Sequence, residues 1–277
     1  MKLNRKIRLF CSCWLTFFSL SFAEAQPDLN LEKNFTVANK QVNQFLRRFN
    51  NEESPKGEKY LREDPMYRNL DVRRMVIPMM FDKRNKLLSD SAITAFTVQV
   101  THKNEPFFLE FHSSKWCAEV DVAVRLNNKP ITYTLYLILQ KEEVGYKWVI
   151  SSAYSEEIDQ LFQRNDSSST TRFIHPMSHE LGFMNLEKVI QDSTIAPYLS
   201  RSYQLDYLSI FIYEWYQKRL EFVSVRSTKF HFFQVPNWYF ILEYFNRNES
   251  NSGWLISTLK PIKDERKNEL YQRIIHR

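Results

Sequence analysis

The sequence contains little glycine, with only 4 glycines among its 277 residues. Loops that cradle phosphate groups need glycines at close, fixed spacing, because the backbone has to approach the phosphate directly. Neither a G-x-G-x-x-G fingerprint nor a Walker loop occurs, and the G-x-S-x-G and H-E-x-x-H motifs are missing as well. The sequence therefore excludes the classical nucleotide-binding loops, the nucleophile elbow of α/β-hydrolases and the HExxH zinc proteases.

The N-terminus has no hydrophobic run long enough to cross a bilayer. Its apolar stretch spans about 14 residues, whereas a transmembrane helix needs roughly 20. Four basic residues precede the stretch, and Ala23-Glu24-Ala25 follows it with the small-x-small pattern of a signal peptidase site. We predict a signal peptide over residues 1–25. A membrane anchor and a lipoprotein anchor are the alternatives, but Cys11 and Cys13 lie inside the apolar stretch and not after it.

Cysteine is also scarce, and Cys117 is the only one that remains once residues 1–25 are removed. An intramolecular disulfide is then excluded, so apolar cores must hold the mature chain together. The leader holds four basic residues and Glu24, which reduces the formal charge from +6 to +3. Mixed charges of that balance argue against a nucleic-acid partner. We expect an exported protein, periplasmic or secreted in a bacterial envelope, with no stable membrane insertion after signal cleavage.

Aromatic side chains, in contrast, are abundant: the chain has 22 Phe, 14 Tyr and 6 Trp. This supply and the chain length allow one large domain or two ordinary ones. The seven small polar residues Asn165–Thr171 interrupt the apolar pattern and predict a linker over residues 165–174. The linker would separate a first domain, 26–164, from a second domain, 175–277.

Each half is predicted to contain helices followed by antiparallel strands. In the first half, apolar residues at helical spacing predict helices over 30–50 and 69–85, the second interrupted at Pro78. The period changes to two from Ile93, which predicts strands around 93–100, 107–111, 118–126, 131–140 and 146–152. The second half is predicted to have helices at 187–195 and 203–215, strands at 219–226, 228–235, 238–246 and 253–259, and a short helix in the tail, 263–277.

The two halves also share residues at matching places. A shift of 106 residues aligns their ends without a gap and gives six identities. The matched pairs are Pro130 with Pro236, Tyr133 with Tyr239, Glu143 with Glu249, Trp148 with Trp254, Ile150 with Ile256, and Ser151 with Ser257. Any two β-hairpins share alternation and aromatic residues, but the helix-then-strand order also recurs. We therefore predict an α+β protein of two similar domains, each with helices packed on a curled antiparallel sheet.

A resemblance to a known family rests on three segments: the helix QVNQFLRRFNNEE and the closing strands YKWVISSA and FNRNESNSGWLISTL. Each half resembles the nuclear transport factor two-like (SnoaL-like) α+β cone, and similar domains occur in secreted Bacteroidetes proteins. The resemblance covers roughly 30–163 and 175–262. It implies a conical pocket between helices and sheet. Some members are enzymes with an Asp/His or Tyr/Asp pair in the pocket, but no residue here matches such a pair, so the resemblance implies a fold and not an activity.

Candidate catalytic residues are few. His175, His179 and Glu180 form the densest cluster, and two histidines four apart would share a helix face as metal ligation requires. Pro176 lies between them and no third ligand has a recognisable spacing, so a helix start is the simpler interpretation and no metal or other cofactor is predicted. His112 is the other candidate, near Cys117, which is more often a small buried hydrophobe than a nucleophile.

The surplus of aromatic residues suggests binding rather than catalysis. Core packing is the simplest role for any one of them, but some could line a pocket or a partner-facing sheet. Trp116, Tyr136 and Trp238 are the candidates for contact with a ligand or partner. The function expected is that of an exported, non-catalytic protein that binds a small ligand or a protein partner. The alternative is a hydrolase- or isomerase-type enzyme that uses a cone pocket.

Overall fold

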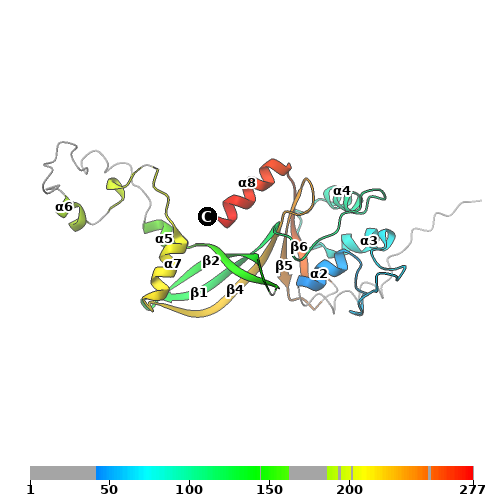
Figure 1. The fold of residues 1–277 in the computed structure, drawn as a ribbon, viewed down its shortest axis with the longest axis horizontal. Helices are drawn as coiled ribbons and strands as arrows, with labels where there is room; N and C mark the ends of the chain where they lie inside the picture. Colours follow the sequence, from blue (N-terminus) through cyan, green and yellow to red (C-terminus); the bar gives the residue numbers. More distant parts are fainter. Residues whose placement is uncertain are drawn as a thin grey trace, which may run out of the picture.

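A computed structural model describes residues 42–143, 145–161, 186–192, 195–200, 202–248 and 251–276 (Figure 1). The predicted signal peptide and linker lie outside these residues. The helices are α2 (Val42–Phe49), α3 (Leu70–Val76), the 3₁₀ turn η1 (Ile77–Met80), α4 (Asp90–Val100), α5 (Glu156–Leu161), α6 (Leu186–Gln191), the 3₁₀ turn η3 (Ala196–Tyr198), α7 (Tyr207–Tyr216) and α8 (Asp264–Ile275). The strands are β1 (Trp116–Leu126), β2 (Lys129–Glu142), β3 (Gly145–Tyr154), β4 (Leu220–Phe232), β5 (Trp238–Phe245) and β6 (Gly253–Pro261).

The six strands form one antiparallel sheet in the order β3-β2-β1-β4-β5-β6. Strands β1–β3 and β4–β6 are two meanders, and the pairing of β1 with β4 joins them edge to edge. This confirms a mixed α+β fold with an antiparallel sheet. The sequence predicted a separate sheet in each half, whereas the two halves share a single, unclosed sheet. The duplication of a domain stays a prediction.

The turns of the first meander follow from local chemistry. Asn127 and Asn128 both have positive φ, 50° and 66°, and link Leu126 directly to Lys129. Asparagine tolerates this left-handed backbone better than most residues, and a two-residue hairpin needs it at both central positions. These two asparagines therefore account for the tight turn between β1 and β2.

The prediction of a strand that begins at Ile93 is wrong, because residues 90–100 form the helix α4. Phe96, Val98 and Val100 alternate as in a strand, but Phe96 and Val100 are also four residues apart and share a helix face. Both are fully buried, whereas the side chain of Val98 is 53% exposed. The Thr97 hydroxyl donates to the Ile93 carbonyl, a bond only helical backbone offers. Residues 107–111 are likewise irregular and not a strand.

The helix predicted over 69–85 ends where its proline indicated. Asn69 caps α3, and its side-chain oxygen accepts from the amides of Asp71 and Val72. Pro78 lacks the amide that a continuing α-helix needs, and the chain tightens there into η1. In the second half, the strands predicted at 219–226 and 228–235 are one long strand, β4, and the tail helix is confirmed as α8.

The helices of each half lie mainly against strands of the other half. Phe96 of α4 makes edge-to-face contacts with Trp238 and Phe240 of β5, at centroid distances of 5.6 and 5.8 Å. In the opposite direction, Phe211 of α7 packs on Tyr133 of β2 at 5.1 Å. Figure 1 shows α2, α3 and α4 beside β5 and β6, with α5 and α7 at the far end of β1 and β2. The two groups of helices cover opposite ends of one face of the sheet.

We call this side the inner face. Side chains alternate along β1, so Trp116, Ala118 and Val122 point to the inner face and Cys117 and Glu119 to the outer face. Helix α8 covers part of the outer face, where Ile275 packs in a cluster with Cys117 and other apolar side chains. The stretch of the inner face between the two groups of helices is less covered, and it holds the candidate site.

Candidate functional site

A continuous series of aromatic rings crosses the inner face from β3 to β5. Neighbouring rings are 4.3–6.2 Å apart between centroids, within the range of favourable aromatic contacts. We call this series the aromatic row; in order, its members are Tyr146, His112, Phe111, Trp116, Trp148, Phe230, Trp254 and Tyr244.

The aromatic row also shows that the sheet is curled. Trp148 and Trp254 lie on β3 and β6, the two edge strands, yet both rings pack against Phe230, at 6.2 and 5.0 Å. Five strand spacings would separate the edges of a flat sheet by about 24 Å. The two edges must therefore bend toward each other over the inner face, which makes that face concave.

The middle of the row is buried and its ends are open. Trp116 is fully buried and Phe230 is 8% exposed, so these rings form the floor. At the two ends, Tyr146 is 41% exposed and Tyr244 is 50% exposed, and Trp148 is exposed beside the floor. The aromatic row therefore has exposed rings at its ends that are supported by buried rings in its middle, as a contact surface requires.

Beyond the row, the exposed apolar surface continues onto β4. Val225 pairs with Val122 and Phe222 pairs with Val124, so both point to the inner face, and both are exposed. A hollow of about 350 Å³ lies between β4 and β5, where the two strands diverge; it is lined by residues 225–229, Glu243, Tyr244 and Trp254.

The outer face carries a polar network instead. His231 bonds Glu119 through Nε2 at 3.0 Å and the Tyr239 hydroxyl through Nδ1 at 2.7 Å. Lys229 Nζ donates to the other Glu119 oxygen at 3.1 Å. Burial alone would raise the pKa of Glu119, but the hydrogen bond from His231 and the charges of His231 and Lys229 outweigh burial and lower that pKa to about 2.

This network is suited to hold the sheet together and not to perform covalent chemistry. Burial raises the pKa of Cys117 to about 12 and also raises the pKa of Tyr239. Both groups are therefore protonated at neutral pH, and neither supplies a thiolate or phenolate. The side chain of His231 is buried, and both of its ring nitrogens already have partners.

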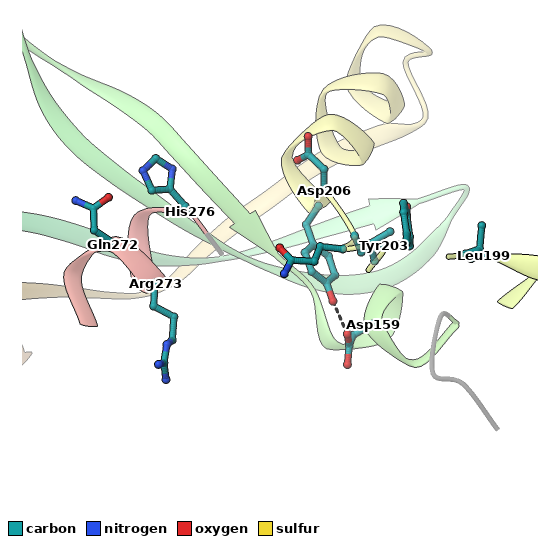
Figure 2. A pocket seen from close by; sticks show the side chains of 10 residues that line it. Asp159, Leu199, Tyr203, Asp206, Gln272, Arg273 and His276 are labelled. Atoms are coloured by element: carbon teal, nitrogen blue, oxygen red, sulfur yellow. Dashed lines mark hydrogen bonds between the residues drawn. The ribbon is translucent and has the colours of Figure 1, made fainter. Parts of the chain in front are cut away.

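Another hollow, of about 790 Å³, lies among α5, the start of α7 and the end of α8 (Figure 2). Its lining includes Asp159, Asp206, Arg273 and His276, and the hydroxyl of Tyr207 donates to Asp159. Figure 2 shows Arg273 and His276 leaving α8 in opposite directions. Tyr207 and Asp159 are the pair that meets at this hollow, and Tyr207 is buried. Figure 2 shows Asp206, Arg273 and His276 apart from that pair, so they do not join it as general acid–base chemistry would require.

The residues predicted from sequence lie in different places. His175, His179 and Glu180 fall outside the described residues. His112 is exposed and stacks on Tyr146 at 4.3 Å. Trp116, Tyr136 and Trp238 are all buried, and the indole nitrogen of Trp238 donates to Gln99. As binding residues these three stay a prediction, but in the folded chain they are packing residues.

Sequence reasoning missed Tyr146, Tyr244, Phe222 and Val225 as exposed members of the site. The alternation of aromatic and polar residues in each strand placed them on one face of a strand. It did not indicate that the two hairpins share a sheet, and only the strand order brings their aromatic residues together.

Comparison of the chain with protein-family models, with curated proteins and with solved structures finds no match to any of them. Within the described parts of the chain, no helix is both long and apolar enough to span a bilayer. Over the same residues, no group of three or more His, Cys, Asp or Glu side chains is placed to hold a metal ion.

Proposed function

We propose that this chain is an exported, non-catalytic binding protein, and that the aromatic row is its contact surface for a segment of a polypeptide partner. The observation that supports the proposal is the combination of exposed ends and a buried floor. Tyr and Trp side chains give large contact areas for few rotatable bonds, which is why they dominate protein contacts. A rigid floor lowers the entropy lost on binding because its rings are already fixed.

The shape of the site favours a polypeptide over a small molecule. Sites for small molecules are concave cavities that enclose most of the ligand surface. The aromatic row is long and open, and it continues onto the exposed Val225 and Phe222 of β4. An extended segment can follow such a surface and contact several rings in succession, whereas a compact ligand would leave most of them in water.

The alternative, a hydrolase- or isomerase-type enzyme, has less support. Catalysis of either kind needs two or more ionisable groups that converge where a substrate can reach them. The His231 network converges on the outer face, but His231 and Tyr239 are buried, and the partly exposed Glu119 and Lys229 are already paired with each other. At the hollow of Figure 2, Tyr207 and Asp159 meet but Tyr207 is buried, and the exposed Asp206, Arg273 and His276 lie apart from them.

We also propose that the two halves descend from one duplicated unit related to the nuclear transport factor two-like cone. Three features support this. The matched Trp148 and Trp254 lie on the third strand of each meander. Both contact the ring of Phe230. Helix α4 of the first half packs on β5, and helix α7 of the second half packs on β2, a reciprocal arrangement that fits a two-fold relation about the β1–β4 pairing.

Site-specific photo-crosslinking tests the binding function. A photoreactive phenylalanine analogue replaces Tyr146 or Tyr244, the two exposed ends of the aromatic row, in cells that produce the chain. We expect adducts of the same mass from both positions. Leu87 is the matched control, because it is 92% exposed but lies in the loop before α4, away from the row. Adducts of equal yield from Leu87, or no adduct from either tyrosine, would contradict the proposal.

A further inference from the structure

The first two-thirds of β4 has one unpaired edge. β1 pairs with β4 along its whole length, from Leu220 to Phe232. On the other side, β5 pairs only with the four residues Lys229–Phe232. Among the described residues no strand pairs with that side of β4 between Leu220 and Thr228. The side chains from Glu221 to Arg226 are all exposed, and Figure 1 shows this part of β4 along the margin of the sheet.

Such an edge attracts another strand. Its free amides and carbonyls are ready to pair, and Phe222, Val223 and Val225 give it an apolar character that soluble proteins usually avoid on open edges. Single charges are the usual protection, because a like charge on an approaching strand repels it. Here the charges are of opposite sign, with Glu221 near one end of the segment and Arg226 near the other.

We propose that a second copy of this chain pairs antiparallel with β4 along this edge, which joins two sheets into one across a two-fold axis. In the register centred between Val223 and Ser224, Glu221 of each copy lies opposite Arg226 of the other. In the same register Phe222 lies opposite Val225. The two-fold axis makes each of these pairs occur twice, so the edge is complementary to itself in charge and in apolar contact.

The bulges of β4 are consistent with this register. Relative to β1, β4 carries an extra residue at Val223 and another at Arg226. When Val223 and Ser224 count as one position, Phe222 and Val225 both point to the inner face, as their pairing with Val124 and Val122 shows. Residues opposite each other in the joined sheet then share a face, as antiparallel pairing requires.

Glu221 and Arg226 already have partners within their own chain, but these contacts are exposed and can be exchanged for contacts with a second copy. Glu221 bonds Arg125 at 3.2 Å, but both side chains are half exposed or more, so the pair holds them weakly. Arg226 donates one guanidinium nitrogen to the Thr132 hydroxyl of β2 in an exposed hydrogen bond, so the side chain has to leave Thr132 and turn to the open edge of β4 to meet Glu221 of the second copy. An interface made chiefly of one strand pair is small, so we expect a weak, reversible dimer.

A charge-swap series tests the proposal by sedimentation equilibrium at protein concentrations from micromolar to submillimolar. We expect the wild-type chain to dimerise. Glu221→Arg alone and Arg226→Glu alone should each weaken the dimer by roughly tenfold or more, because two like-charged pairs replace two ion pairs. The double variant Glu221→Arg/Arg226→Glu should recover the wild-type affinity, because it restores opposite charges across the axis. Thermal melts of all four proteins show whether folding is retained.

Hydrogen exchange supplies a second readout. The amides of residues 222–225 should exchange more slowly as protein concentration rises, whereas those of α7 should not change. A monomer at every concentration would overturn the proposal, as would a dimer that responds to neither single swap. Adducts to an unrelated polypeptide from positions on this edge would show that the occupant is a different chain. The two proposals share Phe222 and Val225. Their tests are distinct, because sedimentation of the charge-swap variants reports self-association, whereas the crosslinks from Tyr146 and Tyr244 report a partner by its mass.

Discussion

At the scale of single residues, Phe230 connects the two halves of the sequence. Its ring contacts Trp116, Trp148 and Trp254, which come from β1, β3 and β6. The sequence predicted that Trp148 and Trp254 are equivalent packing residues, because they recur in the same Trp-x-Ile-Ser frame. It could not predict their common partner, because that depends on which strands are neighbours. The polar network of the outer face was not predictable for the same reason, because the segment KFHFFQV shows one histidine among aromatic residues and does not indicate its bond to Glu119 of β1.

Ionisation of Glu119 should make the free energy of unfolding depend on pH. Its folded-state pKa of about 2 lies below the ordinary value of 4.5, so its ionised form stabilises the native state at and above pH 4.5. That contribution is lost as the pH falls from 4.5 towards 2. Glu119→Gln should lower the free energy of unfolding at pH 7 by about 1.5–3 kcal/mol, the typical loss of a charged hydrogen bond. It should also flatten the dependence on pH in that window, measured by urea titrations.

Glu143→Gln is the matched control for this variant, because Glu143 is exposed in the turn after β2. It should leave both the unfolding free energy and its dependence on pH close to wild type. A Glu119→Gln protein that still loses stability between pH 4.5 and 2 as steeply as wild type would show that other groups cause the acid sensitivity.

At the scale of elements, the local spacing of apolar residues predicts a helix or strand correctly only where one period fits, and it does not indicate the partner of that element. The residues of α4 satisfy both a two-residue and a four-residue period over a short stretch, and burial against β5 decides between them. The tail helix α8 was predicted correctly from Leu270, Ile274 and Ile275, which recur at helical spacing. The surface that it covers was not predictable, because Cys117 and Tyr239 come from strands far away in sequence.

Helix α8 should control access to Cys117. Ser151 and Ser152 of β3 donate to the carbonyls of Ile275 and Ile274, which anchors the end of α8 over the outer face. Ile275→Ala should destabilise the fold by about 2 kcal/mol or more, as is typical of truncation in a core. In a chain that begins at Gln26, it should also speed the reaction of Cys117 with a thiol reagent. Gln272→Ala, an exposed change on the same helix, should alter neither quantity.

At the scale of the whole molecule, the halves defined by sequence are not the packed units. The core around Phe96 combines helices from before residue 101 with β4, β5 and β6 of the second half, and it also includes Trp116 and Ala118 of β1. The core around Tyr133 combines strands of the first half with α7 of the second half, and it also includes Ile158 of α5. Sequence periodicity reports which residues are buried but not against which partner, so it predicted two self-contained domains. The exchange of helices follows from the joined sheet, which places each group of helices nearest to the other meander.

Because helices of each half pack on strands of the other half, we predict that neither half folds when it is produced alone. Residues 26–164 alone should not fold into a cooperative unit, because Phe96 would lose Trp238 and Phe240 and the edge of β1 would lose β4. We expect circular dichroism and limited proteolysis to show a fragment that melts without a sigmoidal transition. Residues 165–277 should behave in the same way, and an equimolar mixture of the two should recover a single transition, since each fragment supplies the helices that cover the other. A sigmoidal melt of fragment 26–164 by itself would mean that the first half is an autonomous domain, and that its helices can repack onto their own strands.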